Sequence, residues 1–294
     1  MRALIVAKKE FVDIITSKRF MALLFAMVVF FLMSVLQTLS ASRISMGTAI
    51  GFFGSSGIAF VGGIFGIALG FDMITREKES GTLRILLTHP LFRDEIIIGK
   101  AIGAFLAICL ASFVTMLFMV GAITMRYTPS FEEILSLAKL TLATNAYLFT
   151  FFSIAFLVSA MVKNSSTSLA ITIGIFIVLA LMIPMFSSVI AQSLAGQPPE
   201  EPFDLMRNQN FRNASDPRWV SYMEEMRSYR EKVQSITSTI SVFSPVSSYT
   251  TIVGSLTQST VFRTVDITKN ILSLLIIPAV LFGIAYFRFT REEL

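Results

Sequence analysis

The densest cluster of charged side chains in this sequence lies in a short connector between two apolar segments. Residues 71–100 read FDMITREKESGTLRILLTHPLFRDEIIIGK, with acids and bases on both sides of a leucine-rich stretch. A short helix with an apolar face can dock in the groove of a partner protein, and flanking charges then set register and partner choice. The connector could therefore be a protein-binding element. The alternative is that its charges are solvated and its leucines pack on the chain's own helices.

Patterns typical of catalytic and metal sites are missing from the sequence. Gly99-Lys100 is followed by Ala101 and lacks the upstream glycine of a phosphate-binding loop. His89 is the one histidine, so histidine metal sites and catalytic triads have almost nothing to draw on. We predict that the chain is not an enzyme and holds no catalytic, cofactor or metal site. No acidic residue falls deep in a predicted span, which argues against a carrier driven by protons or sodium.

The elements that flank the connector have the composition of membrane spans. The chain of 294 residues is 54% hydrophobic and 15% charged, whereas soluble domains carry about 25% charged residues. A helix needs roughly 20 apolar residues to cross the hydrocarbon. The candidate spans are Phe20–Leu39, Thr48–Phe71, Ile96–Thr124, Leu137–Val162, Ser168–Ala191 and Asn270–Phe287. We predict an all-α integral membrane protein with six transmembrane helices.

Lysine and arginine residues indicate how the spans are oriented, because short cytoplasmic connectors carry an excess of both. Basic residues gather before the first span, in the 71–100 connector and after the last span, while the first exterior connector has only Arg43. Both termini and the connector are therefore expected on the cytoplasmic side of the plasma membrane. The net charge of +5 reflects this topology, so no nucleic-acid partner is needed to explain it.

The chain divides into regions on this basis. Residues 1–19 place apolar side chains at helical intervals with lysines between them, which predicts an interfacial amphipathic helix in contact with membrane lipid. A tail without fixed structure is the alternative. Residues 20–191 hold spans one to five, with a cytoplasmic elbow at 72–95 between the second and third spans. Residues 192–267 form an exterior loop and helix, and residues 268–294 hold the sixth span and a cytoplasmic tail.

The connector resembles the corresponding segment of type-2 ABC transporter permeases. In that family the second span runs into an acid, Gly-Thr-Leu, paired leucines, a proline, an arginine and, after an apolar stretch, Gly-Lys. The matching residues here are Glu79, Gly81, Thr82, Leu83, Leu86, Leu87, Pro90, Arg93, Gly99 and Lys100. The amphipathic start and the six-span plan are similar to the family as well. So is FSPVSSY at 243–249, which looks like the segment before the last span in members with a large outer loop between spans five and six.

The resemblance implies that the elbow is a coupling helix, which docks on a separate cytosolic ABC ATPase. That partner would bind ATP and Mg²⁺, this chain would bind no cofactor, and a second permease subunit would complete the transporter as a homodimer or heterodimer. Outward transport is the direction that the family implies. The residues expected to couple to the ATPase are Glu77, Glu79, Gly81, Thr82, Leu83, Arg84, Leu86, Leu87, Thr88, His89, Pro90 and Arg93, with Arg84, Thr88 and His89 near the tip.

Small and polar residues inside the predicted spans suggest helix packing. Gly62, Gly66 and Gly70 share one helix face, which lets another helix approach closely in lipid. That helix could belong to this chain or to the second permease. Thr141, Thr144 and Asn145 also cluster on one face. They could line a translocation path or form bonds between helices. Pro184 and Pro278 are expected to kink the fifth and sixth spans.

The exterior region contains one predicted helix. Asp216-Pro217 predicts its start, with the acid as cap and proline at the first helical position. A heptad-like apolar stripe follows at Trp219, Tyr222, Met226, Tyr229, Val233, Ile236 and Ile240. The stripe could lie on the outer mouth of the chain's own bundle, contact the second permease or bind an exterior partner.

Two other functions stay open. A channel or carrier would work without an ATPase. A signalling or mechanical relay would pass ATPase-driven motion to an exterior partner through the 217–240 helix without moving cargo. The cargo is not readable from the sequence. Members of the family move drugs, lipids, polysaccharides or sodium, and relatives with a large outer loop leave a sulfur- or copper-related role open.

Overall fold

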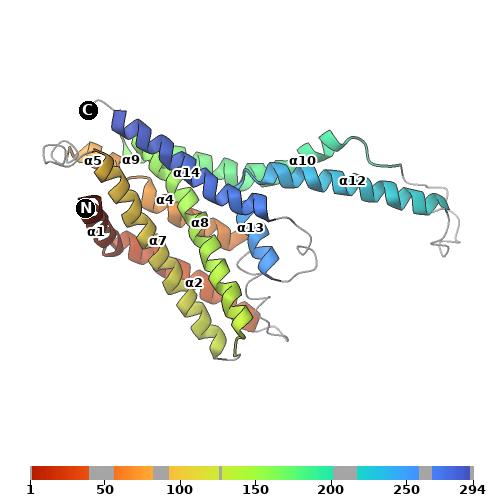
Figure 1. Ribbon diagram of the computed structural model, residues 1–294, viewed down its shortest axis with the longest axis horizontal. Helices are drawn as coiled ribbons and strands as arrows, with labels where there is room; N and C mark the ends of the chain where they lie inside the picture. The colour runs from red at the N-terminus through yellow and green to blue at the C-terminus, as the bar shows by residue number, and fades with distance from the viewer. Residues whose placement is uncertain are drawn as a thin grey trace.

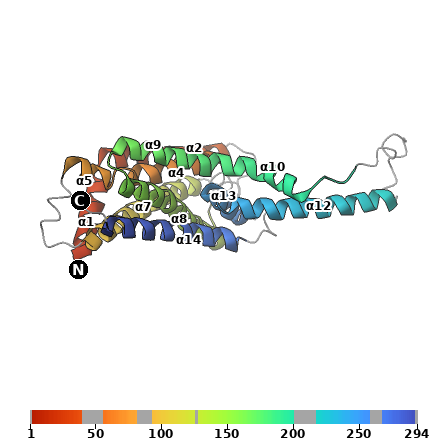
Figure 2. The same ribbon diagram turned by 90° about the horizontal axis from the view of Figure 1, so that it is seen from above.

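The computed structural model describes residues 2–39, 56–81, 93–125, 128–200, 217–257 and 267–291. Every regular element in these ranges is a helix, which confirms the predicted all-α class. The elements are α1 (Arg2–Ile15), α2 (Lys18–Leu39), α4 (Ser56–Gly70), α5 (Thr75–Ser80), α7 (Arg93–Thr124), α8 (Phe131–Met161), α9 (Ser165–Ile177), the π-helix η1 (Val178–Met182), α10 (Ile183–Ala195), α12 (Pro217–Ser241), α13 (Pro245–Leu256) and α14 (Thr268–Arg291). They form an elongated bundle with both termini at one end, and α12 projects from the opposite end (Figures 1 and 2).

Several helices are long and apolar enough to cross a membrane. Among the described residues these segments are Ala59–Ser80, Arg93–Thr124, Phe131–Met161, Ser165–Ala195 and Thr268–Arg291. They overlap predicted spans two to six, of which residues 48–55 lie outside the described ranges, and α2 occupies the segment predicted as the first span. α8 begins earlier than predicted because a capping box starts it. Ser130 accepts the Glu133 N–H, and the Glu133 carboxylate accepts the Ser130 N–H at 2.7 Å.

The glycine face of α4 packs against α8. A Cβ atom added at Gly62 would lie 3.2 Å from the Leu148 side chain, and one at Gly66 would overlap the Leu148 carbonyl oxygen. At Gly70 it would lie 2.7 Å from the Phe152 carbonyl oxygen. Only glycine allows two helix backbones to come this close. Of the two partners that the sequence left open, the structure places this face against a helix of the same chain.

A second pair of glycines, Gly99 and Gly103, seats α1 on α7. A Cβ atom added at either position would come within 2.9 Å of a carbonyl oxygen of α1. The two helices therefore touch backbone to backbone. Leu4 and Ile5 point away from this contact and are 64% and 69% exposed, as expected of an amphipathic helix whose outer face meets lipid.

The fifth predicted span contains a π-helical turn directly before Pro184. Proline has no N–H, and its ring blocks the carbonyl group four residues earlier, so a regular α-helix cannot continue through it. In η1 the Ile183 N–H instead donates to the Val178 carbonyl oxygen, five residues back. The helix then continues to Ala195. The irregularity predicted at Pro184 is therefore a widened turn that keeps the span continuous.

Two stacked tyrosines join α4, α8 and α13 at the centre of the bundle. The rings of Tyr147 and Tyr249 have centroids 4.6 Å apart. The Tyr147 hydroxyl donates to the Ala59 carbonyl oxygen, and the Tyr249 hydroxyl shares a 3.1 Å hydrogen bond with Thr144. Both phenol groups are fully buried, so these bonds satisfy them without water. Tyr249 ends the FSPVSSY segment, which therefore anchors α13 inside the bundle.

The helix α12 begins at Pro217, where the sequence predicts its start, and runs beside α10 (Figures 1 and 2). The seven residues of its predicted stripe are all half-buried, while most other α12 residues are exposed. The Lys232 ammonium donates to the Ala195 carbonyl oxygen at the end of α10, at 3.2 Å. α10 thus covers part of the stripe, and α12 extends away from the bundle.

Replacing Gly66 by Ala should force α4 away from α8, because the new methyl group meets a backbone oxygen that cannot rotate aside. We expect a loss of roughly 1–3 kcal/mol of stability, read as a lower thermal midpoint of the detergent-solubilised protein. Gly174→Ala is the control, since nothing lies within 4 Å of a Cβ atom there and alanine is the better helix former by about 1 kcal/mol. An unchanged midpoint for Gly66→Ala would contradict the close packing of α4 on α8.

Candidate functional site

The connector opens with the short helix α5, whose first turn is capped by a serine from another helix. The backbone N–H groups of Ile74 and Thr75 both donate to the Ser159 hydroxyl oxygen at 3.0 Å. Ser159 lies near the end of α8 and is fully buried. The first N–H groups of a helix have no partner within it, so a hydroxyl acceptor there stabilises it by about 1 kcal/mol. α8 therefore fixes the point where the second span turns into the connector.

Side chains of α5 in turn cap the neighbouring ends of α8 and α9. The Glu79 carboxylate accepts the backbone N–H and the hydroxyl of Ser165 at the start of α9, each at 2.8 Å. The Lys78 ammonium donates to the Ala160 carbonyl oxygen in the last turn of α8, at 2.7 Å. An acid at a helix N-terminus and a base at a C-terminus both oppose the helix dipole. Lys78 and Glu79 thus hold α5 to α8 and α9.

A buried lysine joins α1, α5 and α7. Lys100 lies on α7, and its side chain is only 4% exposed. Its ammonium group donates to Glu10 of α1 at 2.9 Å and lies 2.7 Å from a carboxylate oxygen of Glu77 on α5. Burying a lone charge is very costly, and carboxylates within hydrogen-bond distance offset that cost. Removing one partner of such a buried pair typically costs about 3–5 kcal/mol.

These groups border a cleft of about 500 Å³ at the end of the bundle that carries both termini (Figure 1). It is lined by Lys9, Glu10, Asp13, Ile14, Ser17, Arg19, Ala68, Leu69, Asp72, Met73, Arg76, Glu77, Ser80 and Lys100. Arg19 and Asp72 pair through two hydrogen bonds of 2.9 Å. The guanidinium group also lies 5.2 Å from the Phe71 ring centroid. The hydrogen bonds that Arg19 donates to Asp72 raise the pKa of the arginine.

The structure describes only part of the set predicted to couple to an ATPase. Glu77 and Glu79 make the bonds described above. Gly81 ends α5 with a φ of 70°, in the left-handed region that favours glycine at a helix end. Arg93 is the first residue of α7. The residues outside the described ranges are Thr82, Leu83, Arg84, Leu86, Leu87, Thr88, His89 and Pro90.

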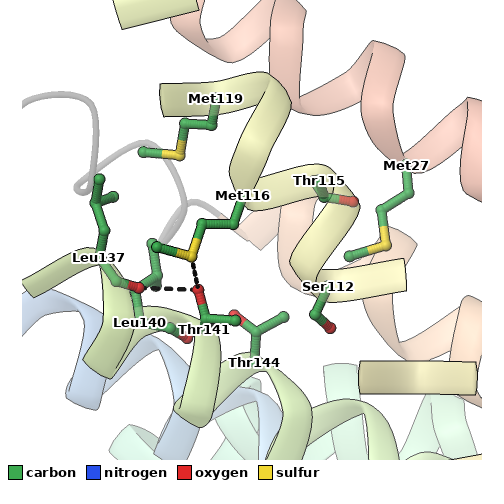
Figure 3. A pocket seen from close by; sticks show the side chains of 9 residues that line it. All are labelled: Met27, Ser112, Thr115, Met116, Met119, Leu137, Leu140, Thr141 and Thr144. Atoms are coloured by element: carbon green, nitrogen blue, oxygen red, sulfur yellow. Dashed lines mark hydrogen bonds between the residues drawn. The ribbon is translucent and has the colours of Figure 1, made fainter. Parts of the chain in front are cut away.

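The residues predicted for a translocation path lie at or beside a small cavity between α2, α7 and α8 (Figure 3). Its volume is about 20 Å³, enough for one water molecule. Its lining residues are Met27, Ser112, Thr115, Met116, Met119, Leu137, Leu140, Thr141 and Thr144. Thr141, Thr144 and Asn145 each donate to a backbone carbonyl oxygen four residues earlier in α8, at 2.8–3.0 Å. Thr141 also bonds the Met116 sulfur of α7 at 3.0 Å, and Thr144 bonds Tyr249 of α13 at 3.1 Å, so these two residues form bonds between helices as well.

Lys100, Glu10 and Ser159 were not predicted as site residues. For Lys100 a signal was present, because a lysine inside an apolar helix must find a partner, and Glu10 and Glu77 are acids on the same predicted side of the membrane. Ser159 gave no comparable signal. A serine in an apolar helix usually bonds to its own backbone, and only the fold brings Ile74 next to it.

Comparison with known proteins identifies the family. The sequence model described as ABC-2 family transporter protein matches residues 4–294. The chain belongs to the ABC-2 transporter family. This match confirms the resemblance seen in the connector and makes the chain a permease-type membrane subunit of an ABC transporter, distinct from the ATPase subunit.

Two curated relatives of this ABC-2 permease are both named "Probable ABC transporter permease protein NosY". The protein from Stutzerimonas stutzeri is 26% identical over 123 residues, which cover 40% of this chain and 44% of the relative. The protein from Pseudomonas aeruginosa is 39% identical over 51 residues, which cover 17% of this chain and 18% of the relative. The chain therefore matches less than half the length of either relative, and these matches support the family but no particular cargo.

Removing the Ser159 hydroxyl should loosen the start of α5 in this ABC-2 permease. In Ser159→Ala the Ile74 and Thr75 N–H groups lose their shared acceptor. We expect amide hydrogen exchange in residues 72–80 to speed up on the order of fivefold, from about 1 kcal/mol per cap. Ser136→Ala is the control, since the hydroxyl of this partly exposed serine on the same helix donates to the Glu132 carbonyl oxygen within α8 and does not contact α5. Equal exchange in both variants would remove Ser159 as the cap of α5.

Proposed function

We propose that this chain is the membrane-spanning subunit of an exporter that is driven by a separate cytosolic ABC ATPase. Two permeases pair in the plasma membrane, and each binds one ATPase subunit, which holds ATP and Mg²⁺. Residues 72–95 pass the closure of the ATPase to the spans. α2 is the first of six spans in this proposal, and both termini and the elbow face the cytoplasm, as the distribution of basic residues indicates.

The observation that supports the proposal best is the attachment of α5 to three membrane helices. Ser159 and Ala160 bond it to α8, Ser165 bonds it to α9, and Lys100 bonds it to α7. A loosely attached connector could move without displacing the spans. A connector that is bonded to α7, α8 and α9 passes its displacement on to all three helices. This is what a coupling element has to do.

The contacts within the chain also support a docking face that does not include Glu77 and Glu79. Glu77 and Glu79 are engaged with α7 and α9. The docking face in this proposal is Leu83, Leu86 and Leu87, whose spacing predicts one apolar side of a short helix that would suit a groove on a partner. Arg84, Thr88 and His89 flank this face near the tip.

Replacing Leu86 or Leu87 by Asp should detach the ATPase, because a charge on the docking face would have to be buried unpaired. We expect the ATPase activity that copurifies with the tagged permease from native membranes to fall at least about tenfold, because removing a central contact costs about 2 kcal/mol or more. Val220→Asp is the matched control. Val220 is an exposed apolar residue on α12, at the other end of the molecule.

Retained ATPase copurification in both leucine variants would count against the elbow as the docking element. Loss of ATPase in the Val220→Asp control would show that the assay reports general damage. The thermal midpoint of each purified variant separates the two cases, because neither leucine substitution is expected to unfold the spans.

The proposed topology places Lys8 in the cytoplasm and Arg227 outside. Both side chains are exposed, so single cysteines at these sites can be labelled in a Cys109→Ser background. A membrane-impermeant maleimide applied to intact cells should label Arg227→Cys, and it should label Lys8→Cys only after permeabilisation. The reverse pattern would put the elbow outside the cell, beyond the reach of a cytosolic ATPase.

A further inference from the structure

We propose that Lys100 is a positioning residue that makes the N-terminal helix α1 move together with the elbow. The inference rests on the proposed coupling function. It adds α1 as a further moving part to the helices that the elbow contacts directly.

α1 packs on α7 at the helical turn that carries Lys100. Gly99 and Gly103 flank this turn, and at both positions the backbone of α1 leaves no room for a Cβ atom. Helices in such close contact shift as one body, because any sliding would bring backbone atoms into collision. α1 therefore follows α7 at the position of Lys100.

The Lys100 ammonium group also links α1 and α7 to α5. It binds Glu10 of α1 at 2.9 Å and Glu77 of α5 at 2.7 Å. Elsewhere α1 and α5 line the cleft of about 500 Å³. The Lys100 ammonium group thus bonds both α1 and α5 to its own helix, α7.

A second ion pair borders the same cleft but is less suited to this role. The Arg19 side chain is 44% exposed, whereas Lys100 is 4% exposed. Salt and water screen an exposed pair, and such pairs contribute little. A buried pair lies in a medium of lower dielectric constant, where its attraction is much stronger. Arg19 also lies on α2 and Asp72 precedes α5, so Lys100, with its bonds to Glu10 and Glu77, is the residue that links α1 to α5.

The charge balance at Lys100 predicts what its loss would do. Glu10 and Glu77 supply two carboxylates for one ammonium group, and the second carboxylate oxygen of Glu77 is buried without a hydrogen-bond partner among the described residues. Without the lysine, two like charges would face each other. Their repulsion would open the cleft between α1 and α5.

The width of the cleft can be measured directly on the full chain. Lys9 and Arg76 line the cleft from α1 and α5, and both are exposed. Spin labels are attached to Lys9→Cys and Arg76→Cys in a Cys109→Ser background in lipid nanodiscs. Pulsed electron paramagnetic resonance then measures the distance between the two labels. We expect a narrow distribution with Lys100, a longer and broader one in Lys100→Met, and a narrow one in Lys100→Arg. A narrow, unshifted distribution in Lys100→Met would overturn the proposal.

Coupling is measured on the permease with its ATPase. In Lys100→Met we expect the maximal ATPase rate of the complex to fall about tenfold while the KM for ATP stays unchanged, because the nucleotide site lies on the other subunit. Lys100→Arg should keep at least half the rate. Lys232→Met is the control, since this lysine bonds a helix end at the far side of the molecule. A wild-type rate in Lys100→Met would contradict a role in coupling.

A neutral triple variant separates positioning from stability. Glu10→Gln, Glu77→Gln and Lys100→Met together remove the repulsion and the ion pairs, so the protein should keep its thermal midpoint but still show the low ATPase rate. Recovery of the wild-type rate would mean that Lys100 only stabilises the fold. If the wild-type chain brings down no ATPase at all, the proposed function fails. The distance distributions then decide by themselves whether Lys100 holds α1 to α5.

Discussion

A buried ammonium group has to be paired, and this requirement at Lys100 determines how one end of the molecule is built. The lysine lies on an apolar helix with almost no access to water, so its charge is tolerated only because carboxylates come to it. Glu10 has to arrive from the N-terminal helix and Glu77 from the segment before the elbow. Satisfying one charge therefore fixes the relative positions of α1, α5 and α7.

Glycine packing brings these groups to the right places. Gly66 and Gly70 let α4 lie directly on α8, so the chain leaves α4 beside Ser159, and this serine caps α5. Gly99 and Gly103 let α1 lie on α7, so Glu10 reaches Lys100. In lipid there is no hydrophobic drive between helices, and close backbone contact supplies the attraction instead. The polar bonds of the connector depend on this apolar packing.

The sequence predicted the features that depend on lipid and on local chain geometry. The approximate positions of the long apolar helices, the all-α class and the start of α12 at Pro217 follow from hydropathy and from proline at a helix start. A glycine face was visible in α4, but its partner was not, because a small face fits any helix. The helix α5 was missed since it is six residues long and is held by contacts some 80 residues away in sequence, such as those of Thr75 with Ser159 and Glu79 with Ser165. Patterns within a window cannot reveal bonds of this kind.

The charge density of the connector now has a physical explanation that differs from the first interpretation. Three charged residues of the connector bond to other parts of the chain: Asp72 binds Arg19, Glu77 binds Lys100, and Glu79 binds the start of α9. These charges hold the connector to the bundle, so in the proposed mechanism the leucines of residues 82–92 have to supply most of the contact with the ATPase. Attachment and docking are then carried by different residues. An ATPase could therefore change its groove to suit the leucines without disturbing the bonds that pass its motion to the spans.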